Sequence, residues 1–188
     1  MRRRPHLSFS LALTSTLIAP VAFADDTHDC SKTSTIGVIV PLSAGAVSSG
    51  TAVKNSVELS DEKNDQQNCV RFVFEDDQMI PKNTVTAVNK LISVDHIDGL
   101  IVYGTPTSLA VADQIDRQGI PMIALSILGK VVEGRSHIVK HWCTAEKLNA
   151  AVFDEVKRRG YKKVAVVSMI NEAMLGLRDL YRGADPAE

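Results

Sequence analysis

Residues 36–59 are IGVIVPLSAGAVSSGTAVKNSVEL, and this stretch decides the class of fold. It begins as an unbroken apolar run, continues through a segment made almost entirely of Gly, Ala and Ser, and ends in an amphipathic pattern. A short apolar run is typical of a strand covered on both faces, and the amphipathic end is typical of a helix. The stretch is therefore predicted to form the first β/α unit, with the small residues in the connecting loop.

The same alternation of short apolar runs and amphipathic segments continues along the chain. The predicted strands are Thr35–Pro41, Val70–Glu75, Gly99–Tyr103, Pro121–Leu125, His137–His141 and Lys163–Met169. The predicted helices are Thr51–Asn64, Pro81–Val94, Thr107–Gln118 and Thr144–Arg159. Strands and helices that alternate with short connections predict an α/β fold, in which a doubly wound parallel sheet is flanked by helices.

The N-terminus has the pattern of a cleaved signal peptide over residues 1–24. Three arginines, Arg2 to Arg4, precede an apolar stretch that is too short to span a bilayer, and Ala22-Phe23-Ala24 supplies a small-residue cleavage motif. The mature chain is therefore expected to begin at Asp25 and to be a soluble protein of the periplasm.

Composition excludes several classes of function. The net charge of the 188 residues is −1, and no basic stripe interleaved with aromatic residues indicates nucleic-acid binding. The sequence contains no CxxC pair and no clustered histidines, so no metal site is predicted. No cofactor is predicted either. Of the three cysteines, Cys30 and Cys69 precede the first and second predicted strands, so that they form a disulfide if these strands are parallel neighbours. The alternative is that Cys30, Cys69 and Cys143 are all unpaired.

In a doubly wound sheet, ligands bind at the loops that follow the carboxyl ends of the strands. These loops are Leu42–Gly50, Asp76–Gln78, Gly104–Ser108 and Ser126–Gly129. Most of them offer hydroxyls and backbone N–H groups, and two lead into helix N-termini, which suits an anionic group such as a carboxylate.

The motifs of common catalytic sites are absent from these loops. There is no P-loop ending, no G-x-G-x-x-G and no G-x-S-x-G. Adjacent residues on an extended chain point to opposite sides, so Asp76 and Asp77 are not predicted to act as paired acids. The interpretation favoured for Trp142 is packing rather than ligand stacking. The chain is therefore not expected to be an enzyme.

Three segments, IGVIVPLSAGAVSSGTAVKNSVEL, FVFEDDQMIPKNTVTAVNKLI and IDGLIVYGTPTSLAVADQIDRQGIPMIALS, carry a resemblance to a known family. Together they resemble the first lobe of type I periplasmic solute-binding proteins, most closely the leucine/isoleucine/valine-binding type that feeds ABC importers. The resemblance implies a clamshell of two Rossmann-like lobes that binds a small solute and delivers it to a membrane permease. It also implies no catalysis, no nucleic-acid partner and a monomeric state when complete.

The resemblance also implies which residues contact the ligand. Thr105 matches a residue whose hydroxyl binds the ligand carboxylate. Ser126 matches a residue whose carbonyl accepts a hydrogen bond from the ligand ammonium group. Ser49 matches a position near the ligand side chain. Ser43 and Thr107 lie in the same loops and complete the set of candidate binding residues. Leu128 stands where amino-acid binders place Thr, so the expected ligand is a small polar solute such as an amino acid, an amide or a related anion.

The predicted domain organisation is an incomplete two-lobe protein. Residues 25–128 are expected to form the incomplete N-terminal lobe, and residues 129–188 the crossing and the start of the second lobe. The chain therefore resembles a truncated product of this family. Two alternatives to an importer receptor stay open: a non-transport envelope regulator or sensor domain on the same fold, and a non-functional fragment.

Overall fold

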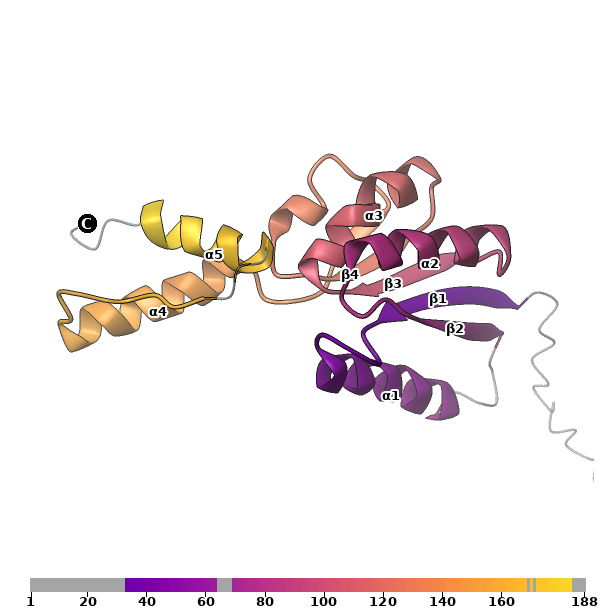
Figure 1. Ribbon diagram of the computed structural model, residues 1–188, viewed down its shortest axis with the longest axis horizontal. Helices are drawn as coiled ribbons and strands as arrows, with labels where there is room; N and C mark the ends of the chain where they lie inside the picture. Colours follow the sequence, from indigo (N-terminus) through magenta and orange to yellow (C-terminus); the bar gives the residue numbers. More distant parts are fainter. Residues whose placement is uncertain (1–32, 64–68, 169, 171, 184–188) are drawn as a thin grey trace, which may run out of the picture.

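The computed structural model describes residues 33–63, 69–168, 170 and 172–183. The predicted signal peptide and Cys30 lie outside the described residues. The sheet contains β1 (Ser34–Val40), β2 (Val70–Asp76), β3 (Gly99–Tyr103), β4 (Met122–Leu125) and β5 (Ile138–Lys140). Its strand order is β2-β1-β3-β4-β5, and every neighbouring pair is parallel (Figure 1). The predicted α/β fold with a doubly wound parallel sheet is confirmed.

Helices flank both faces of the sheet but do not cover it completely, since Ile123 of β4 and Val139 of β5 are 41% and 60% exposed. The helices are α1 (Val47–Lys63), α2 (Pro81–Ser93), α3 (Thr105–Arg117), α4 (Ala145–Arg159) and α5 (Glu172–Gly183), and a 3-10 turn, η2 (Gly129–Val131), follows β4. Helices α2 and α3 lie side by side on one face, and α1 lies on the other (Figure 1). Helix α1 begins four residues before the predicted Thr51, so half of the small-residue loop is helical. Helix α3 begins at Thr105 rather than Thr107.

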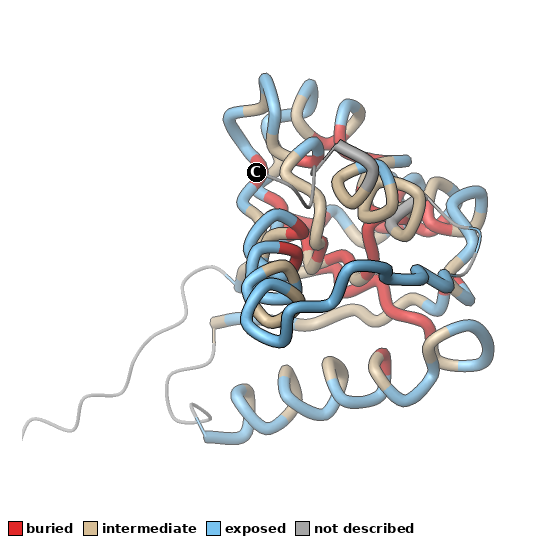
Figure 2. The backbone as a smooth tube through the Cα atoms, turned by 90° about the vertical axis from the view of Figure 1, so that its left-hand side faces the viewer, coloured by how far each residue is buried: buried red, intermediate tan, exposed pale blue. Residues whose placement is uncertain are grey.

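The hydrophobic core lies between the sheet and helices α2 and α3. Ile39, Leu100 and Val102 of the strands pack against Leu91 of α2 and Ile115 of α3, and all five are almost completely buried. Each such side chain contributes about 2 kcal/mol through burial. Figure 2 shows that α1, the lowest helix in the view, is mostly exposed, and Gly50 is its one buried residue.

The predicted strand Lys163–Met169 is wrong over its described residues, 163–168. This segment is extended but pairs with no other strand among the residues that the structure describes, and Val167 is 97% exposed. A strand requires hydrogen bonds to a neighbour, and valine-rich composition alone does not supply one.

The sheet continues beyond Leu128, where the sequence placed the end of the first lobe. Strand β5 pairs with β4 in the register Met122↔Ile138, so the same sheet extends to Lys140. Helices α4 and α5 pack against each other and extend away from the sheet (Figure 1). We therefore propose that the first lobe ends after Lys140 and that the crossing to a second lobe follows it.

The N-terminal ends of β1 and β2 lie side by side, as the disulfide prediction requires. The Ser34 N–H donates to the Cys69 carbonyl at 2.7 Å. Cys69 is disulfide-bonded, and Cys143 is an exposed free thiol. Because Cys30 lies outside the described residues, its pairing with Cys69 stays a prediction.

Asp116, near the end of α3, forms hydrogen bonds to the residues that precede β5. Its Oδ1 accepts hydrogen bonds from the backbone N–H groups of Ser136 and His137, at 3.0 and 2.9 Å, and lies 3.1 Å from the His137 Nδ1. The backbone N–H of His137 is the main cause that lowers the pKa of Asp116 below its ordinary value of 3.8.

This arrangement predicts that Asp116→Asn changes the acid sensitivity of the fold. A carboxyl whose pKa is lower in the folded state adds stability that is fully present above its ordinary pKa and is lost as the pH falls through the lowered value. The wild type is therefore expected to lose stability below about pH 4, and the variant to lose less over the same range. Thermal denaturation midpoints between about pH 6 and about pH 3 measure the difference. The exposed substitution Asp154→Asn is the control, and an Asp116→Asn pH profile parallel to the wild type would contradict the prediction.

Candidate functional site

A cavity of about 340 Å³ opens at the carboxyl edge of the sheet. The loops after all five strands contribute to it, and α5 adds Met174 from the far side. The lining residues are Ala46, Met79, Tyr103, Gly104, Thr105, Pro106, Leu125, Ile127, Trp142 and Met174. This volume lies within the range of small-molecule sites, which is roughly 300–1,000 Å³. The cavity lies where parallel α/β sheets bind ligands.

The wall of the cavity is mainly aromatic and apolar. The rings of Tyr103 and Trp142 meet edge to face, with centroids 6.0 Å apart and an interplanar angle of 69°. Met79 and Met174 add polarisable thioethers, and Trp142 is about half exposed. No lining side chain among the described residues carries a formal charge. Such a wall suits the apolar body of a small ligand.

The N-terminus of α3 supplies the polar side of the cavity. Gly104 precedes the helix, has φ +105° and ψ +145°, and provides no side-chain cap. The first N–H groups of an α-helix have no partner within the helix, and they carry a partial positive charge. Because Gly104 and Thr105 both line the cavity, an anionic group bound there lies next to this helix end.

Thr105 and Ser126 connect α3 to the loop after β4. Their hydroxyl oxygens are 3.0 Å apart and form a buried hydrogen bond. The Thr105 Oγ1 also accepts from the Ile127 N–H at 3.2 Å, and the Ser126 Oγ accepts from the Leu128 N–H at 3.3 Å. Thr105 therefore lines the cavity, but its hydroxyl is already used to hold the wall in place.

The other predicted residues, Ser43, Ser49 and Thr107, lie outside the cavity lining. The buried Thr107 hydroxyl donates to the Tyr103 carbonyl at 2.5 Å. The exposed Ser43 hydroxyl donates to Asp76. Ser49 is half-buried in α1. A direct contact between these three side chains, or Ser126, and a ligand stays a prediction.

Asp76 and Asp77 have separate structural roles. Burial raises the pKa of Asp76, but hydrogen bonds from Ser43 and from the backbone of Leu42 and Gln78 outweigh it, so the pKa is lowered. Asp77 is buried and accepts from the Met79 N–H at 2.9 Å and the Thr84 hydroxyl at 2.8 Å, and its burial raises its pKa. The first carboxylate closes the β1 loop onto the β2 loop, and the second holds the start of α2.

Sequence reasoning missed Met79, Tyr103, Trp142 and Met174. Trp142 was predicted to pack, and its ring does meet that of Tyr103 edge to face. The signal for its place in the cavity lining was its position after β5, at the same edge as the other loops. Tyr103 is the last residue of β3, so it was counted with the strand. Met174 comes from a distant helix, and no local pattern places it in the cavity.

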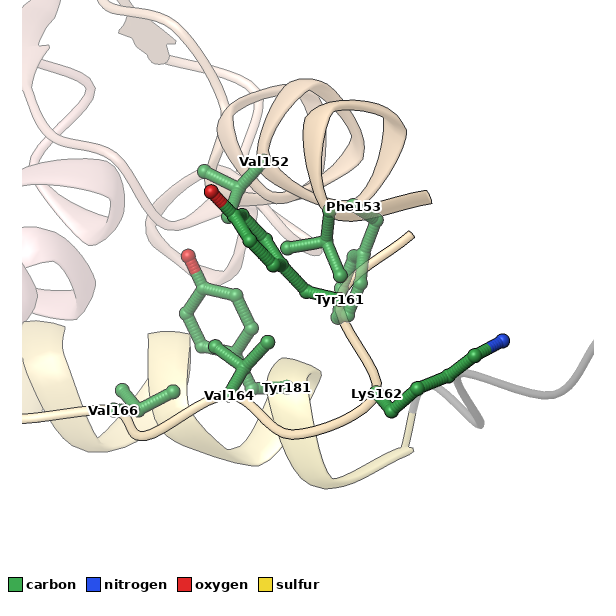
Figure 3. A pocket seen from close by; sticks show the side chains of 8 residues that line it. Val152, Phe153, Tyr161, Lys162, Val164, Val166 and Tyr181 are labelled. Atoms are coloured by element: carbon green, nitrogen blue, oxygen red, sulfur yellow. The ribbon is translucent and has the colours of Figure 1, made fainter. Parts of the chain in front are cut away.

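A second hollow of about 160 Å³ lies between α4, α5 and the extended segment after α4. Figure 3 shows the ring of Tyr181 near Val164 and the ring of Tyr161 near Val152, whereas Lys162 points away. Phe153 packs against Tyr181 with ring centroids 5.4 Å apart. This hollow is lined mainly by apolar side chains of α4, α5 and the segment between them, and its polar groups are the Tyr161 and Tyr181 hydroxyls and the Lys162 ammonium. The described residues also contain no group of three metal-ligating side chains, and none of their helices is both long and apolar enough to cross a bilayer.

Comparison with known proteins agrees with this geometry. A family model described as periplasmic binding protein matches residues 33–181. The chain belongs to the periplasmic binding protein family. The resemblance to type I solute-binding proteins that the sequence suggested is thereby confirmed. A comparison with curated proteins finds no match.

Solved structures with the same fold come from this family of periplasmic binding proteins. An ABC-transporter solute-binding protein of Rhodopseudomonas palustris BisB5, in complex with 3,4-dihydroxybenzoic acid, is 24% identical with a TM-score of 0.73. The leucine-binding protein LivK of Thermotoga maritima is 21% identical with a TM-score of 0.74. An R. palustris solute-binding protein in complex with 4-hydroxybenzoate is 20% identical with a TM-score of 0.72. Each match covers 80% of this chain but 43%, 45% and 43% of the other chain, so this chain spans less than half the length of these relatives.

Proposed function

We propose that this chain provides a ligand-binding lobe of the solute receptor of an ABC importer. The observation that carries the proposal is the cavity at the carboxyl edge, to which the loops after all five strands contribute. Family membership and the solute-binding relatives support the same role. The proposed complete receptor acts in the periplasm, delivers its ligand to a membrane permease and is a monomer.

The proposed ligand is a small carboxylate with an apolar body. The N-terminus of α3 suits the carboxylate, and the wall formed by Tyr103, Trp142 and the methionines suits a ring or a branched hydrocarbon. Two of the relatives described above hold hydroxylated benzoic acids, and a third is a leucine-binding protein. The sequence predicted a small polar solute. The proposed ligand is more specific, because the part of it outside the carboxylate is mainly apolar.

The composition of the cavity favours binding over catalysis. Its polar side-chain groups are the Tyr103 and Thr105 hydroxyls and the Trp142 indole N–H, and the Thr105 hydroxyl is already hydrogen-bonded to Ser126 and Ile127. General acid–base or nucleophilic catalysis requires a positioned base or nucleophile next to the reacting group. The lining residues supply no carboxylate, imidazole, amine or thiol for this purpose, so we propose a receptor and not an enzyme.

Isothermal titration calorimetry on the full chain tests the proposal. The ligands are 4-hydroxybenzoate, benzoate and L-leucine, with phenol as a ring without a carboxylate and acetate as a carboxylate without a ring. Saturable binding is expected for at least one of the first three, with much weaker or no binding of phenol and acetate. The absence of binding by all three carboxylates would reject the proposed ligand class.

Trp142→Ala is expected to weaken binding of 4-hydroxybenzoate about tenfold, because an aromatic contact contributes about 0.5–1.5 kcal/mol beyond the burial of area. The loss for L-leucine is expected to be smaller, since a branched alkyl group makes no ring–ring contact. His141→Ala, at the neighbouring exposed position, is the matched control and is expected to leave both affinities unchanged. Equal losses for Trp142→Ala and His141→Ala would contradict the placement of the ring.

A further inference from the structure

Asn149 is a buried polar residue that the proposed binding site does not use. It lies in α4 and is 4% exposed, and neither its Nδ2 nor its Oδ1 has a hydrogen-bond partner among the described residues. A side-chain amide offers two donors and an acceptor, and buried groups of this kind are nearly always paired in stable folds. The unpaired amide therefore requires an explanation.

The residues one turn before and one turn after Asn149 contact two other elements of the fold. Ala145, one turn earlier on the same face of α4, donates its N–H to the Ile127 carbonyl at 3.0 Å. Phe153, one turn later, packs against Tyr181 of α5. The face of α4 that carries Asn149 thus runs from the loop after β4 at one end to α5 at the other.

Two of these three elements, the loop after β4 and α5, border the ligand cavity. Ile127 and Met174 both line it, the first from the loop after β4 and the second from α5. Leu128 contacts α5 at Gly176, where an added Cβ would lie 3.1 Å from the Leu128 methyl carbons. Because α4 and α5 extend away from the sheet as a pair (Figure 1), a movement of this pair alters both the cavity wall and the surroundings of Asn149.

We propose that Asn149 is a positioning residue for closure of the cavity on its ligand. In the arrangement described above its amide is unpaired, and this lowers stability. When α4 and α5 move against the cavity, the Asn149 NH2 group donates to a backbone carbonyl of the Ser126–Leu128 loop. The Ala145 N–H, one turn earlier on α4, already donates to the Ile127 carbonyl of this loop. Ligand binding thereby gains a hydrogen bond that the ligand does not itself make. This inference rests on the proposed function.

The test compares the full wild-type chain with Asn149→Leu, which has a similar size and no hydrogen-bonding group. The ligand-free variant is expected to show a denaturation midpoint a few degrees higher, because the buried unpaired amide is removed. Its affinity for 4-hydroxybenzoate or L-leucine, whichever the wild type binds, is expected to fall about tenfold, which corresponds to about 1.4 kcal/mol. A merely structural role lowers stability and affinity together, so the opposite signs identify a role in closure. Leu148→Ala, on the exposed side of α4, is the matched control.

A measurement on the wild type makes the test independent of how the variant folds. On saturation with the bound ligand, the NMR signals of the Asn149 side-chain NH2 protons are expected to shift downfield and to exchange more slowly. Ligand binding with unchanged NH2 signals, or Asn149→Leu with unaltered affinity or reduced ligand-free stability, would overturn the inference while leaving the proposed function intact. A wild type that binds neither ligand would instead overturn the proposed function, and the inference with it.

Discussion

Gly50→Ala is expected to destabilise the fold by about 3 kcal/mol or more. A Cβ at this position would lie 2.0 Å from the carbonyl oxygen of Pro41 and 2.8 Å from its carbonyl carbon. Both atoms belong to the backbone at the end of β1, so no side-chain rotation relieves the clash. Helix α1 would have to retreat from the sheet by more than an ångström, and Ala46 of the cavity wall would move with it.

A loss of stability in Gly50→Ala would be direct evidence that α1 lies close to β1, because the same substitution usually has the opposite effect. In an exposed helix, replacement of Gly by Ala normally stabilises by about 1 kcal/mol. Urea denaturation followed by far-UV circular dichroism gives the difference in unfolding free energy. Gly129→Ala, where no atom lies within 4 Å of the added Cβ, is the control and is expected to be nearly neutral. A Gly50→Ala variant at least as stable as the wild type would refute the close approach of α1 to β1.

Gly104→Ala is expected to impair stability and ligand binding together. The backbone at Gly104 has φ +105° and ψ +145°, a conformation that residues with a Cβ rarely adopt, and such strain costs about 1–3 kcal/mol. The added Cβ would lie 2.8 Å from both the Met79 Sδ and the Thr107 Oγ1. Met79 would be displaced within the cavity, and the first turn of α3 would shift from the place proposed for the carboxylate.

Calorimetry and urea denaturation separate the two consequences of Gly104→Ala. Affinity for 4-hydroxybenzoate is expected to fall at least about tenfold, and unfolding free energy by about 2–3 kcal/mol. Gly134→Ala is the matched control, because Gly134 has φ +68° but no atom within 4 Å of an added Cβ. It is expected to lose about 1 kcal/mol of stability without change in affinity. A Gly104→Ala variant with wild-type affinity would contradict the proposed site.

The fold was predictable because its signals are local. Each β/α unit carries its own apolar run and its own amphipathic stretch, and the Gly37–Val40 run is followed by a helix that returns the chain to a parallel neighbour. The segment at residues 163–168 shows the limit of this reasoning. Its valines have strand composition, but strand formation depends on a partner elsewhere in the chain, and among the described residues no strand pairs with it.

The location of the cavity was predictable, but its lining was not. The rule that ligands bind at the carboxyl edge pointed to the loops after β1, β3 and β4, and the cavity proposed as the binding site opens there. Hydroxyl-bearing residues were favoured within those loops, yet buried hydroxyls must be satisfied, and Thr105, Ser126 and Thr107 are bonded to one another or to the backbone. The rings and thioethers that form the wall are placed by three-dimensional packing, which spacing along the chain does not reveal.

Strand β3 shows how the fold separates two tasks along a single segment. Leu100 and Val102 are buried in the core, whereas Tyr103, the next residue, lies in the cavity wall. On β3, the residues that build the core and the residue proposed to meet a ligand are therefore different, and they adjoin at the carboxyl end of the strand. An inherited change at Tyr103 or Trp142 can alter recognition while the core stays intact. The framework itself is shared with relatives that are only 20–24% identical to this chain.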